Sequence, residues 1–244
     1  MLLALLYHKI GKGKYSNSLE TLEAHFAHIA AHYPTVLPGE PLPKGLSLCL
    51  TFDDAFFDFY HLIFPLLEKY QLKGLLAVPT AYILEHTSLS AEKRLEKVAS
   101  FPDKAPPIPS PAFCTWEELK TLSNSPLIQI ASHSLHHYPL TSKHVDPEHE
   151  LLASKILLEE KLSTPITSFV YPFGIWDRKV HTHAKKYYSH IFRIGNAYNL
   201  SWKNTNHLLY RVNGDALSSP EFPFARSSRL KHTARFFFNT VRGS

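Results

Sequence analysis

Four apolar segments of this chain each end directly in a polar group or a sharp turn. In chain order, the groups that end these segments are His8, the pair Asp53 and Asp54, His133, and the turn at 171–174. Enzymes built on a barrel of parallel strands form their sites at the carboxyl ends of several strands, whereas an open doubly wound sheet gathers such groups mainly at one switch point. The pattern therefore predicts an α/β barrel rather than an open sheet.

The rest of the chain alternates between short apolar runs and amphipathic segments, as expected of a parallel α/β sheet. Leu19, Phe26 and Ile29 have the spacing of one helix face. Thr115 and Glu118 form a capping box at the start of another helix. We expect strands at 2–7, 46–52, 73–79, 127–132, 166–171, 190–194 and 208–213, and helices at 17–32, 58–70, 116–123, 147–162 and 177–188.

The stretch at about 82–112 interrupts this alternation, because it is charged at first and then rich in proline. A plain connector and a lid or rim loop beside a site are both compatible with that composition. At 244 residues the chain has the length of one α/β barrel. We therefore expect residues 1–244 to form a single domain with an insertion at about 82–112.

Composition limits the partners and the compartment. A formal net charge of +5 is compatible with a mildly basic enzyme surface or with an anionic partner, such as a phospholipid or an acidic glycan; no recognised nucleic-acid-binding motif is present. Cys49 and Cys114 are too few for a disulfide framework. The sequence lacks both an apolar run of roughly 20 residues and a signal-peptide pattern. We expect a protein of the cytoplasm or of the inner membrane face, or an extracytoplasmic one if a leader has been removed.

Asp53 and Asp54 are adjacent carboxylates at the end of an expected strand. Side chains alternate along a strand, so the two carboxylates point in different directions. One can bind a metal ion while the other faces the reacting centre. The alternative is a turn or a helix N-cap, where Asp is common.

His133 and His137 lie four residues apart. If the segment after the strand is helical, both imidazoles fall on one face, as in other metal sites with this spacing. Ser134 could then orient a ligand. Spacing alone also permits His136 in place of His137, or a set of solvated histidines.

Two histidines and one aspartate leave open positions on a divalent ion, where a bound water can become a nucleophile. A neighbouring carboxylate can take its proton. A backbone N–H in the turn at 171–174 could stabilise the oxyanion, and His8 is the candidate donor of a proton to the leaving amine. A hydrogen-bonded histidine at a barrel rim is the alternative for His8.

These strings resemble those of the polysaccharide deacetylases, also called the NodB-homology or carbohydrate esterase 4 family. Thr-Phe-Asp-Asp at 51–54 is similar to the first family motif, Ser-His-Ser-Leu-His-His at 132–137 to the second, and Phe-Val-Tyr-Pro-Phe-Gly at 169–174 to the third. Trp-Glu-Glu-Leu at 116–119 is also similar. The resemblance covers roughly residues 1–195.

The resemblance implies a distorted (β/α)7 barrel and hydrolysis of an N-acetyl group on an amino sugar. It implies one divalent metal, with zinc expected and cobalt, nickel or iron as alternatives. The implied roles are general base for Asp53, metal ligands for Asp54, His133 and His137, and substrate and oxyanion contacts in the turn of Tyr171 and Phe173.

The pair Tyr7-His8 resembles the N-terminal histidine of the branch that deacetylates poly-N-acetylglucosamine, in which the proton donor precedes the first motif. Two departures from the family pattern stand out. Ala55 replaces a glycine, and Val170 stands where many relatives carry an arginine that steadies the base. Asp53 then needs another cation, for which we name Arg211.

Several readings of function stay open. The substrate could be a glycan or a lipid-linked sugar; the alternatives are a metal-independent amidohydrolase acting on a small cyclic amide, or an inactive glycan-binding protein. The segment 226–242 could rest on an anionic membrane or form a packed C-terminal helix. Its basic and aromatic residues are Arg226, Arg229, Lys231, Arg235, Arg242, Phe236, Phe237 and Phe238.

Overall fold

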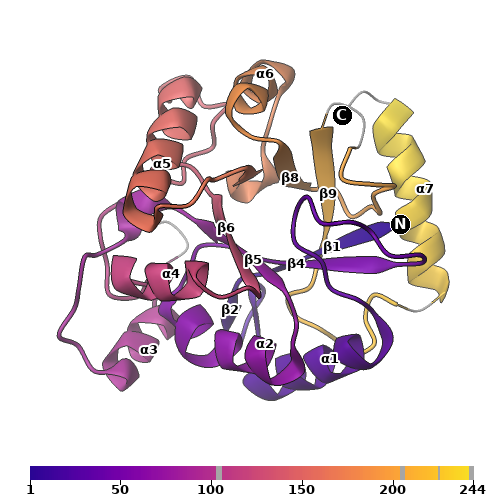
Figure 1. Cartoon of the computed structure of the whole chain (residues 1–244), viewed down its shortest axis with the longest axis horizontal. Helices are drawn as coiled ribbons and strands as arrows, with labels where there is room; N and C mark the ends of the chain where they lie inside the picture. Colours follow the sequence, from indigo (N-terminus) through magenta and orange to yellow (C-terminus); the bar gives the residue numbers. More distant parts are fainter. Residues whose placement is uncertain (103–105, 204–206, 225, 242–244) are drawn as a thin grey trace.

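Seven parallel strands form a closed barrel at the centre of the protein (Figure 1). The structure is a computed structural model that describes residues 1–102, 106–203, 207–224 and 226–241. In barrel order the strands are β1 (Leu2–Tyr7), β4 (Ser47–Phe52), β5 (Gly74–Val78), β6 (Ile128–Ser132), β7 (Ser168–Val170), β8 (His190–Ile194) and β9 (Leu208–Asn213). Pairing of β9 with β1 closes the ring. The distorted (β/α)7 barrel expected from the sequence is confirmed.

The strands are apolar on both faces, which explains why they read as continuous apolar runs rather than as alternating patterns. In β1, Leu2 and Ala4 belong to a small cluster formed by alternate strand residues inside the barrel. Leu3 and Leu5 belong to the larger cluster shared with the surrounding helices. Each strand therefore contributes to two layers of the core at once.

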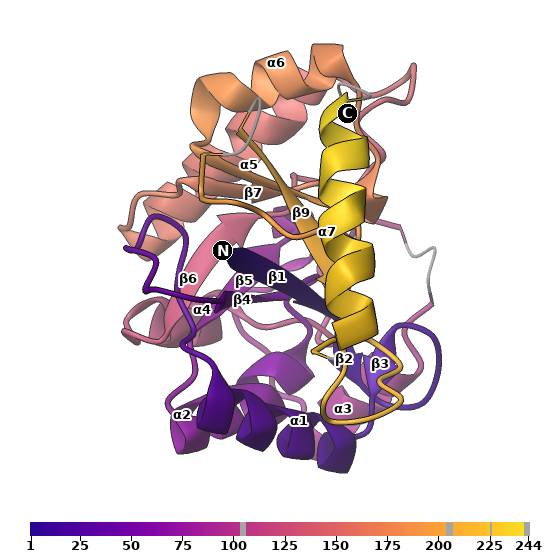
Figure 2. The ribbon, with the colours of Figure 1, turned by 90° about the vertical axis from the view of Figure 1, so that its right-hand side faces the viewer.

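Helices surround the barrel (Figures 1 and 2). They are α1 (Leu19–His32), α2 (Phe64–Tyr70), α3 (Ala91–Ala99), α4 (Trp116–Ser123), α5 (Pro147–Leu162), α6 (Arg178–Tyr187) and α7 (Arg226–Val241). The expected capping box of Thr115 and Glu118 begins α4. The helix expected at 58–70 is divided, because a π-helical turn (Phe59–Ile63) precedes α2 and Pro65, which lacks an N–H, lies in the first turn of α2.

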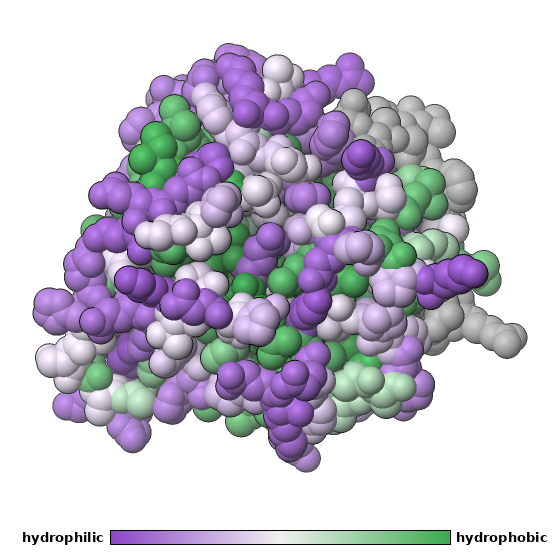
Figure 3. Space-filling model, viewed as in Figure 1, coloured by the Kyte–Doolittle hydropathy of each residue, from purple (hydrophilic) through white to green (hydrophobic). Residues whose placement is uncertain are grey.

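The surface in Figure 3 is largely hydrophilic, with smaller apolar areas between the polar side chains. Within the described ranges, helices with the length and apolarity needed to cross a bilayer are absent.

Candidate active site

The polar groups that follow the strands meet at one cavity of about 600 Å³. His8 follows β1, Asp53 and Asp54 follow β4, and His133 follows β6. Phe173, in the short 3-10 turn after β7 (Pro172–Gly174), also lines the cavity. The structure therefore brings together the four strand ends that the sequence singled out.

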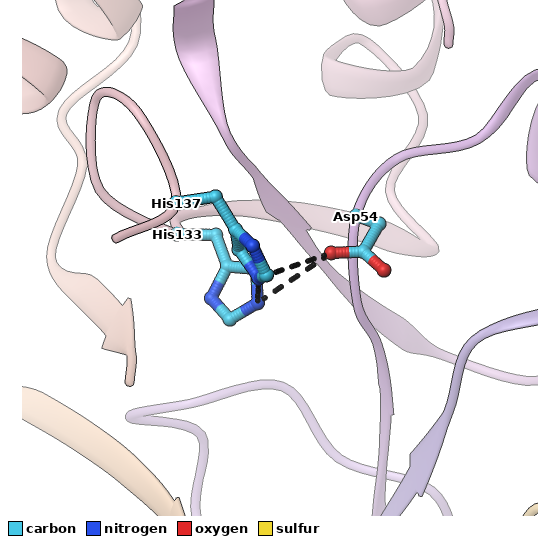
Figure 4. A group of neighbouring side chains, drawn as sticks. All are labelled: Asp54, His133 and His137. Atoms are coloured by element: carbon cyan, nitrogen blue, oxygen red, sulfur yellow. Dashed lines mark hydrogen bonds and ion pairs between the residues drawn. The ribbon is translucent and has the colours of Figure 1, made fainter. Parts of the chain in front are cut away.

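Asp54, His133 and His137 converge on one point (Figure 4). The Nε2 atoms of His133 and His137 lie 3.2 Å apart. Asp54 Oδ1 lies 3.4 Å from Nε2 of His137 and 3.7 Å from Nε2 of His133. One ligand atom from each residue thus faces a shared space, as a small cation requires.

The two imidazoles do not meet on a helix face, so the expectation of a helical segment after the strand is wrong. Two residues of the loop instead have a left-handed backbone conformation, with φ of 67° at Ser134 and 55° at His137. Ser134 Oγ accepts a hydrogen bond of 3.0 Å from the backbone N–H of His137. Ser134 therefore fixes the backbone of the second histidine, which agrees with its expected orienting role.

His136 points away from this group. Its Nδ1 lies 2.7 Å from Oε1 of Glu150, and its backbone N–H donates to Oε2 of the same carboxylate at 2.9 Å. The structure thus brings His137, and not His136, together with Asp54 and His133. Glu150, from α5, anchors the loop that carries His137.

Asp54, His133 and His137 fit a divalent metal because each presents a lone-pair atom to the space that the three residues share. His133 Nδ1 lies 2.7 Å from the carbonyl oxygen of Val170. A carbonyl can only accept, so Nδ1 carries the proton and Nε2 keeps its lone pair. Burial lowers the pKa of His133 and His137 to about 4, which leaves both rings neutral. Burial also raises the pKa of Asp54, and a bound cation would oppose that effect.

Asp53 is held by Arg211, the cation named from the sequence. Arg211 donates from Nη1 to Oδ1 at 2.6 Å and from Nη2 to Oδ2 at 2.9 Å. Burial acts to raise the pKa of Asp53, but the charge and hydrogen bonds of Arg211, with the charge of His8, lower it to about 2. Val170 occupies the apolar interior of the barrel on β7, and Arg211 on β9 supplies the missing cation from another strand.

Breaking this pair should destabilise the fold, because Arg211 and Asp53 are both buried, at 0% and 4% exposed. We expect Arg211→Leu to lower the free energy of unfolding of the metal-free protein by about 3–5 kcal/mol, since it leaves a buried charge uncompensated. Urea titration at pH 7 measures this change. The double variant Arg211→Leu/Asp53→Asn should recover part of the loss; an Arg211→Leu protein as stable as the wild type would contradict the assignment.

His8 forms a second, partly buried pair with Asp215. Its Nδ1 lies 2.5 Å from Asp215 Oδ2, and its backbone N–H donates to Oδ1 at 3.1 Å. Burial acts to lower the pKa of His8, but the hydrogen bond and charge of Asp215, with the charges of Asp53 and Asp54, raise it to about 9. His8 Nε2 points toward the site, 4.0 Å from Asp53 Oδ2. Sequence reasoning missed Asp215, although it follows β9 at a further strand end.

The His8 pair predicts a pH dependence. Because its folded pKa of about 9 exceeds the ordinary 6.5, His8 stays protonated at neutral pH, and its contribution to stability is complete below pH 6.5 and lost as the pH rises through about 9. We expect Asp215→Asn to move the alkaline limit of turnover to lower pH. Initial rates across pH 6 to 10, roughly the range over which His8 would titrate, measure this. An unchanged alkaline limit would contradict the role of Asp215.

Phe173 and Tyr171 differ in position. Phe173 has φ of 58° and is half exposed in the cavity, with its ring centroid 4.7 Å from that of His137. Tyr171 is completely buried; its hydroxyl contacts His181 and its backbone N–H donates to the carbonyl of Phe192. Tyr171 does not line the cavity, and its hydroxyl and N–H both have partners in the core, so its expected substrate contact stays a prediction that this geometry does not support.

Ala55 occupies the position where the family pattern has glycine. Its φ is 54°, directly after Asp54 at 73°. Two successive left-handed residues turn the chain sharply after β4, at a conformational cost of about 1–2 kcal/mol for each residue other than glycine. The departure at Ala55 thus keeps the backbone shape that a glycine would adopt more easily.

Comparisons with solved structures support the same fold. A polysaccharide deacetylase from Bacillus cereus superposes with a TM-score of 0.73 and 21% identity, over 93% of this chain and 68% of that one. IcaB from Ammonifex degensii gives 0.70 and 18% identity, over 93% and 97% of the two chains. The Streptococcus pyogenes deacetylase PplD gives 0.70 and 20% identity, over 95% and 97%.

Sequence comparison identifies the family. The poly-beta-1,6-N-acetyl-D-glucosamine N-deacetylase of Escherichia coli (strain K12) is 29% identical over 96 residues, which are 39% of this chain and 13% of that protein. The family model for polysaccharide deacetylase matches residues 43–190, more than half of the chain. This match includes the first three motifs, the metal-ligand group and Asp53. The protein therefore belongs to the polysaccharide deacetylase family.

Proposed function

We propose that this protein is a metal-dependent hydrolase that removes N-acetyl groups from an amino-sugar-containing glycan or a lipid-linked sugar. The observation that carries the proposal is the convergence of three metal-ligand side chains with an ionised Asp53 and a protonated His8 in one cavity. Each of these groups supplies a separate requirement of amide hydrolysis.

Asp54, His133 and His137 would hold the metal. When bound, a divalent cation polarises the substrate carbonyl and lowers the pKa of a coordinated water. A donor set of two imidazoles and one carboxylate suits zinc, and also cobalt, nickel or iron. His133 is fixed for this role by its hydrogen bond to the Val170 carbonyl.

Asp53 acts as the general base. Its pKa of about 2 keeps it ionised at every working pH, but also makes it a weak base in the resting site. The proton it takes becomes strongly acidic as the attacking water oxygen bonds to the carbonyl carbon, so a weak base suffices at that stage. Arg211 holds the carboxylate in one orientation throughout.

His8 acts as the general acid. The leaving amine needs a proton before the C–N bond can break, and His8 carries one at neutral pH. Asp215 orients the ring through Nδ1 and leaves Nε2 facing the cavity. We assign help in stabilising the oxyanion to the backbone N–H of Phe173, a residue that lines the cavity in the turn after β7.

The substrate class is supported by the Escherichia coli relative, whose name gives poly-beta-1,6-N-acetyl-D-glucosamine as its substrate. Arg211 also weakens the case for an inactive glycan-binding protein, which rested on the missing arginine of the third motif. An N-acetylated glucosamine polymer is the first substrate to try.

Membrane contact by the segment 226–242 stays a prediction. In α7, Phe236 is buried against Tyr210, whereas Leu230 and Phe238 are exposed. The side chains of Arg226, Arg229 and Phe237, and residue Arg242, lie outside the described residues. Contact at the inner membrane face predicts that the protein pellets with anionic but not with neutral liposomes; equal recovery from both would remove the idea.

Acetate release tests the proposed function. We expect the zinc- or cobalt-loaded protein to release acetate from β-1,6-linked N-acetylglucosamine oligomers or chitooligosaccharides, and to lose this activity with a chelator. Restoration by added metal is the control for chelator damage. Turnover that is unchanged by the chelator would favour the metal-independent amidohydrolase. Binding of the oligosaccharide without acetate release would favour the glycan-binding protein.

A further inference from the structure

One side of the active-site cavity is built from aromatic rings. Phe56, Tyr82, Phe101 and Phe113 all line it. The ring of Phe113 is stacked on Phe56 at 4.8 Å, lies 4.8 Å from Tyr82, and meets Phe101 edge-on at 4.8 Å between centroids. We call these four residues the aromatic wall. Three of them come from the stretch 82–113, so the insertion and its return segment form a large part of the cavity.

Arg94 of α3 links the segment that carries Phe113 to α3 and α4. Its Nε donates to the Pro111 carbonyl at 3.0 Å, and its Nη2 to the Phe113 carbonyl at 2.8 Å. The guanidinium also pairs with the carboxylate of Glu118, which belongs to the capping box of α4. Arg94 is only 4% exposed. The wall is thus a fixed part of the folded cavity rather than a loose connector.

The wall offers few hydrogen-bond partners to the hydroxyl groups of a second sugar ring. A pyranose carries several hydroxyl groups, and each loses free energy when it leaves water without a hydrogen-bond partner. Besides the four rings and the hydroxyl of Tyr82, the cavity lining includes Pro79 and Pro102, and Lys9, whose Nζ already donates to the Val98 carbonyl at 3.1 Å. A hydrocarbon group gains free energy when it leaves water for such a surface, whereas the hydroxyl groups of a sugar lose it unless they find hydrogen-bond partners.

We propose that the aromatic wall binds a hydrocarbon group carried by the amino-sugar substrate, so that the substrate is an amphiphile rather than a plain oligosaccharide. This inference rests on the proposed function for the place of the sugar, next to Asp53 and the metal ligands. The hydrocarbon can come from two sources, an alkyl aglycone or an N-acyl chain longer than acetyl. Both present the same chemistry to the wall.

Turnover with matched substrates tests the inference. The reference is methyl 2-acetamido-2-deoxy-β-D-glucopyranoside; one arm replaces the methyl by octyl, and the other replaces the acetyl by octanoyl. We expect kcat/KM at least about tenfold higher in one of the two arms, since burial of a few methylene groups exceeds that effect. The arm that responds identifies the source. Equal kcat/KM for all three substrates would overturn the proposal.

Binding without turnover separates this inference from the proposed function. Octyl β-D-glucopyranoside has no amide to hydrolyse, and calorimetry below its micelle-forming concentration should show it binding at least about tenfold more tightly than methyl β-D-glucopyranoside. Selective binding of the octyl glucoside, with no product from any substrate, would support the hydrocarbon site and contradict the proposed deacetylase activity. Equal binding of the two glucosides would overturn the hydrocarbon site whatever the turnover.

Variants of Phe101 assign the effect to the wall, because Phe101 is only partly buried. Phe101→Lys should remove the preference for octyl, while Phe101→Leu, which stays apolar, should keep most of it. Ile108→Ala is the matched control, because Ile108 lies in the same insertion, is 60% exposed and does not line the cavity. Retention of the full octyl preference in Phe101→Lys would contradict the assignment.

Discussion

Replacement of Asp53 by Asn should lower turnover by at least about 10³-fold, within the range attributed to general acid–base catalysis, and leave the metal content unchanged. Asn keeps the size of Asp but cannot accept the proton of the attacking water. The metal should remain because the three ligand atoms belong to Asp54, His133 and His137. Initial rates of acetate release and elemental analysis of the same preparation measure both effects.

The fold must be checked in this variant, because Asn leaves the buried Arg211 without its carboxylate. Circular dichroism and the urea midpoint serve that purpose. Asp177→Asn is a matched control, since Asp177 caps α6 away from the cavity and Asn is an equally good N-cap. Near-wild-type turnover of a folded Asp53→Asn protein would show that Asp53 is not the base.

Loss of the His8 side chain should have the second largest effect on turnover. We expect His8→Ala and His8→Gln both to slow turnover by about 10²- to 10⁴-fold with the metal retained. Gln can still hydrogen-bond to Asp215 but cannot donate a proton to the amine. Equal losses in the two variants would therefore identify proton donation, rather than support of the loop, as the role of His8.

A substrate with a better leaving group sharpens this test. The nitrophenolate of 4-nitrophenyl acetate leaves without protonation, so the His8 variants should lose much less activity toward this ester than toward a sugar amide. His144→Ala is the control, because His144 is exposed and does not line the cavity. If His8→Gln retained normal rates on sugar amides, the proton donor would have to be sought elsewhere.

Much of the barrel could be predicted because its signals are local. The helix at 147–162 begins at Pro147 after Asp146, whose side chain accepts two backbone N–H groups, and a cap of this kind is readable from sequence. The strands at 190–194 and 208–213 also have the expected bounds. Apolar runs of this length between polar turns leave little freedom in where a buried strand begins and ends.

The details of the site could be predicted only in part, because they depend on long-range contacts and on turn geometry. His8 and Asp215 are 207 residues apart in the chain, and no local pattern links them. The left-handed residues Ser134 and His137 bring the imidazoles together in a way that spacing alone does not specify. Tyr171 is buried away from the cavity lining, because a motif gives no side-chain direction.

The insertion shows a similar limit. Its composition was compatible with either a connector or a rim loop, and the buried Arg94 that decides between them looks like any surface charge in the sequence. In the structure Phe101 and Phe113 line the active-site cavity. Residues of this stretch therefore contribute to the cavity lining, as a rim loop would, and the role of the insertion stays a prediction.

Elemental analysis of the purified protein, wild type beside His133→Ala, tests the central claim most directly, and His144→Ala serves as the control. Each protein is incubated with zinc or cobalt and then freed of unbound ions. We predict about one transition metal ion per chain in the wild type and the control, and almost none in His133→Ala, whose Nε2 faces the other two ligand atoms. No metal in the wild type, or equal metal in all three proteins, would contradict the assignment of Asp54, His133 and His137 as the metal site.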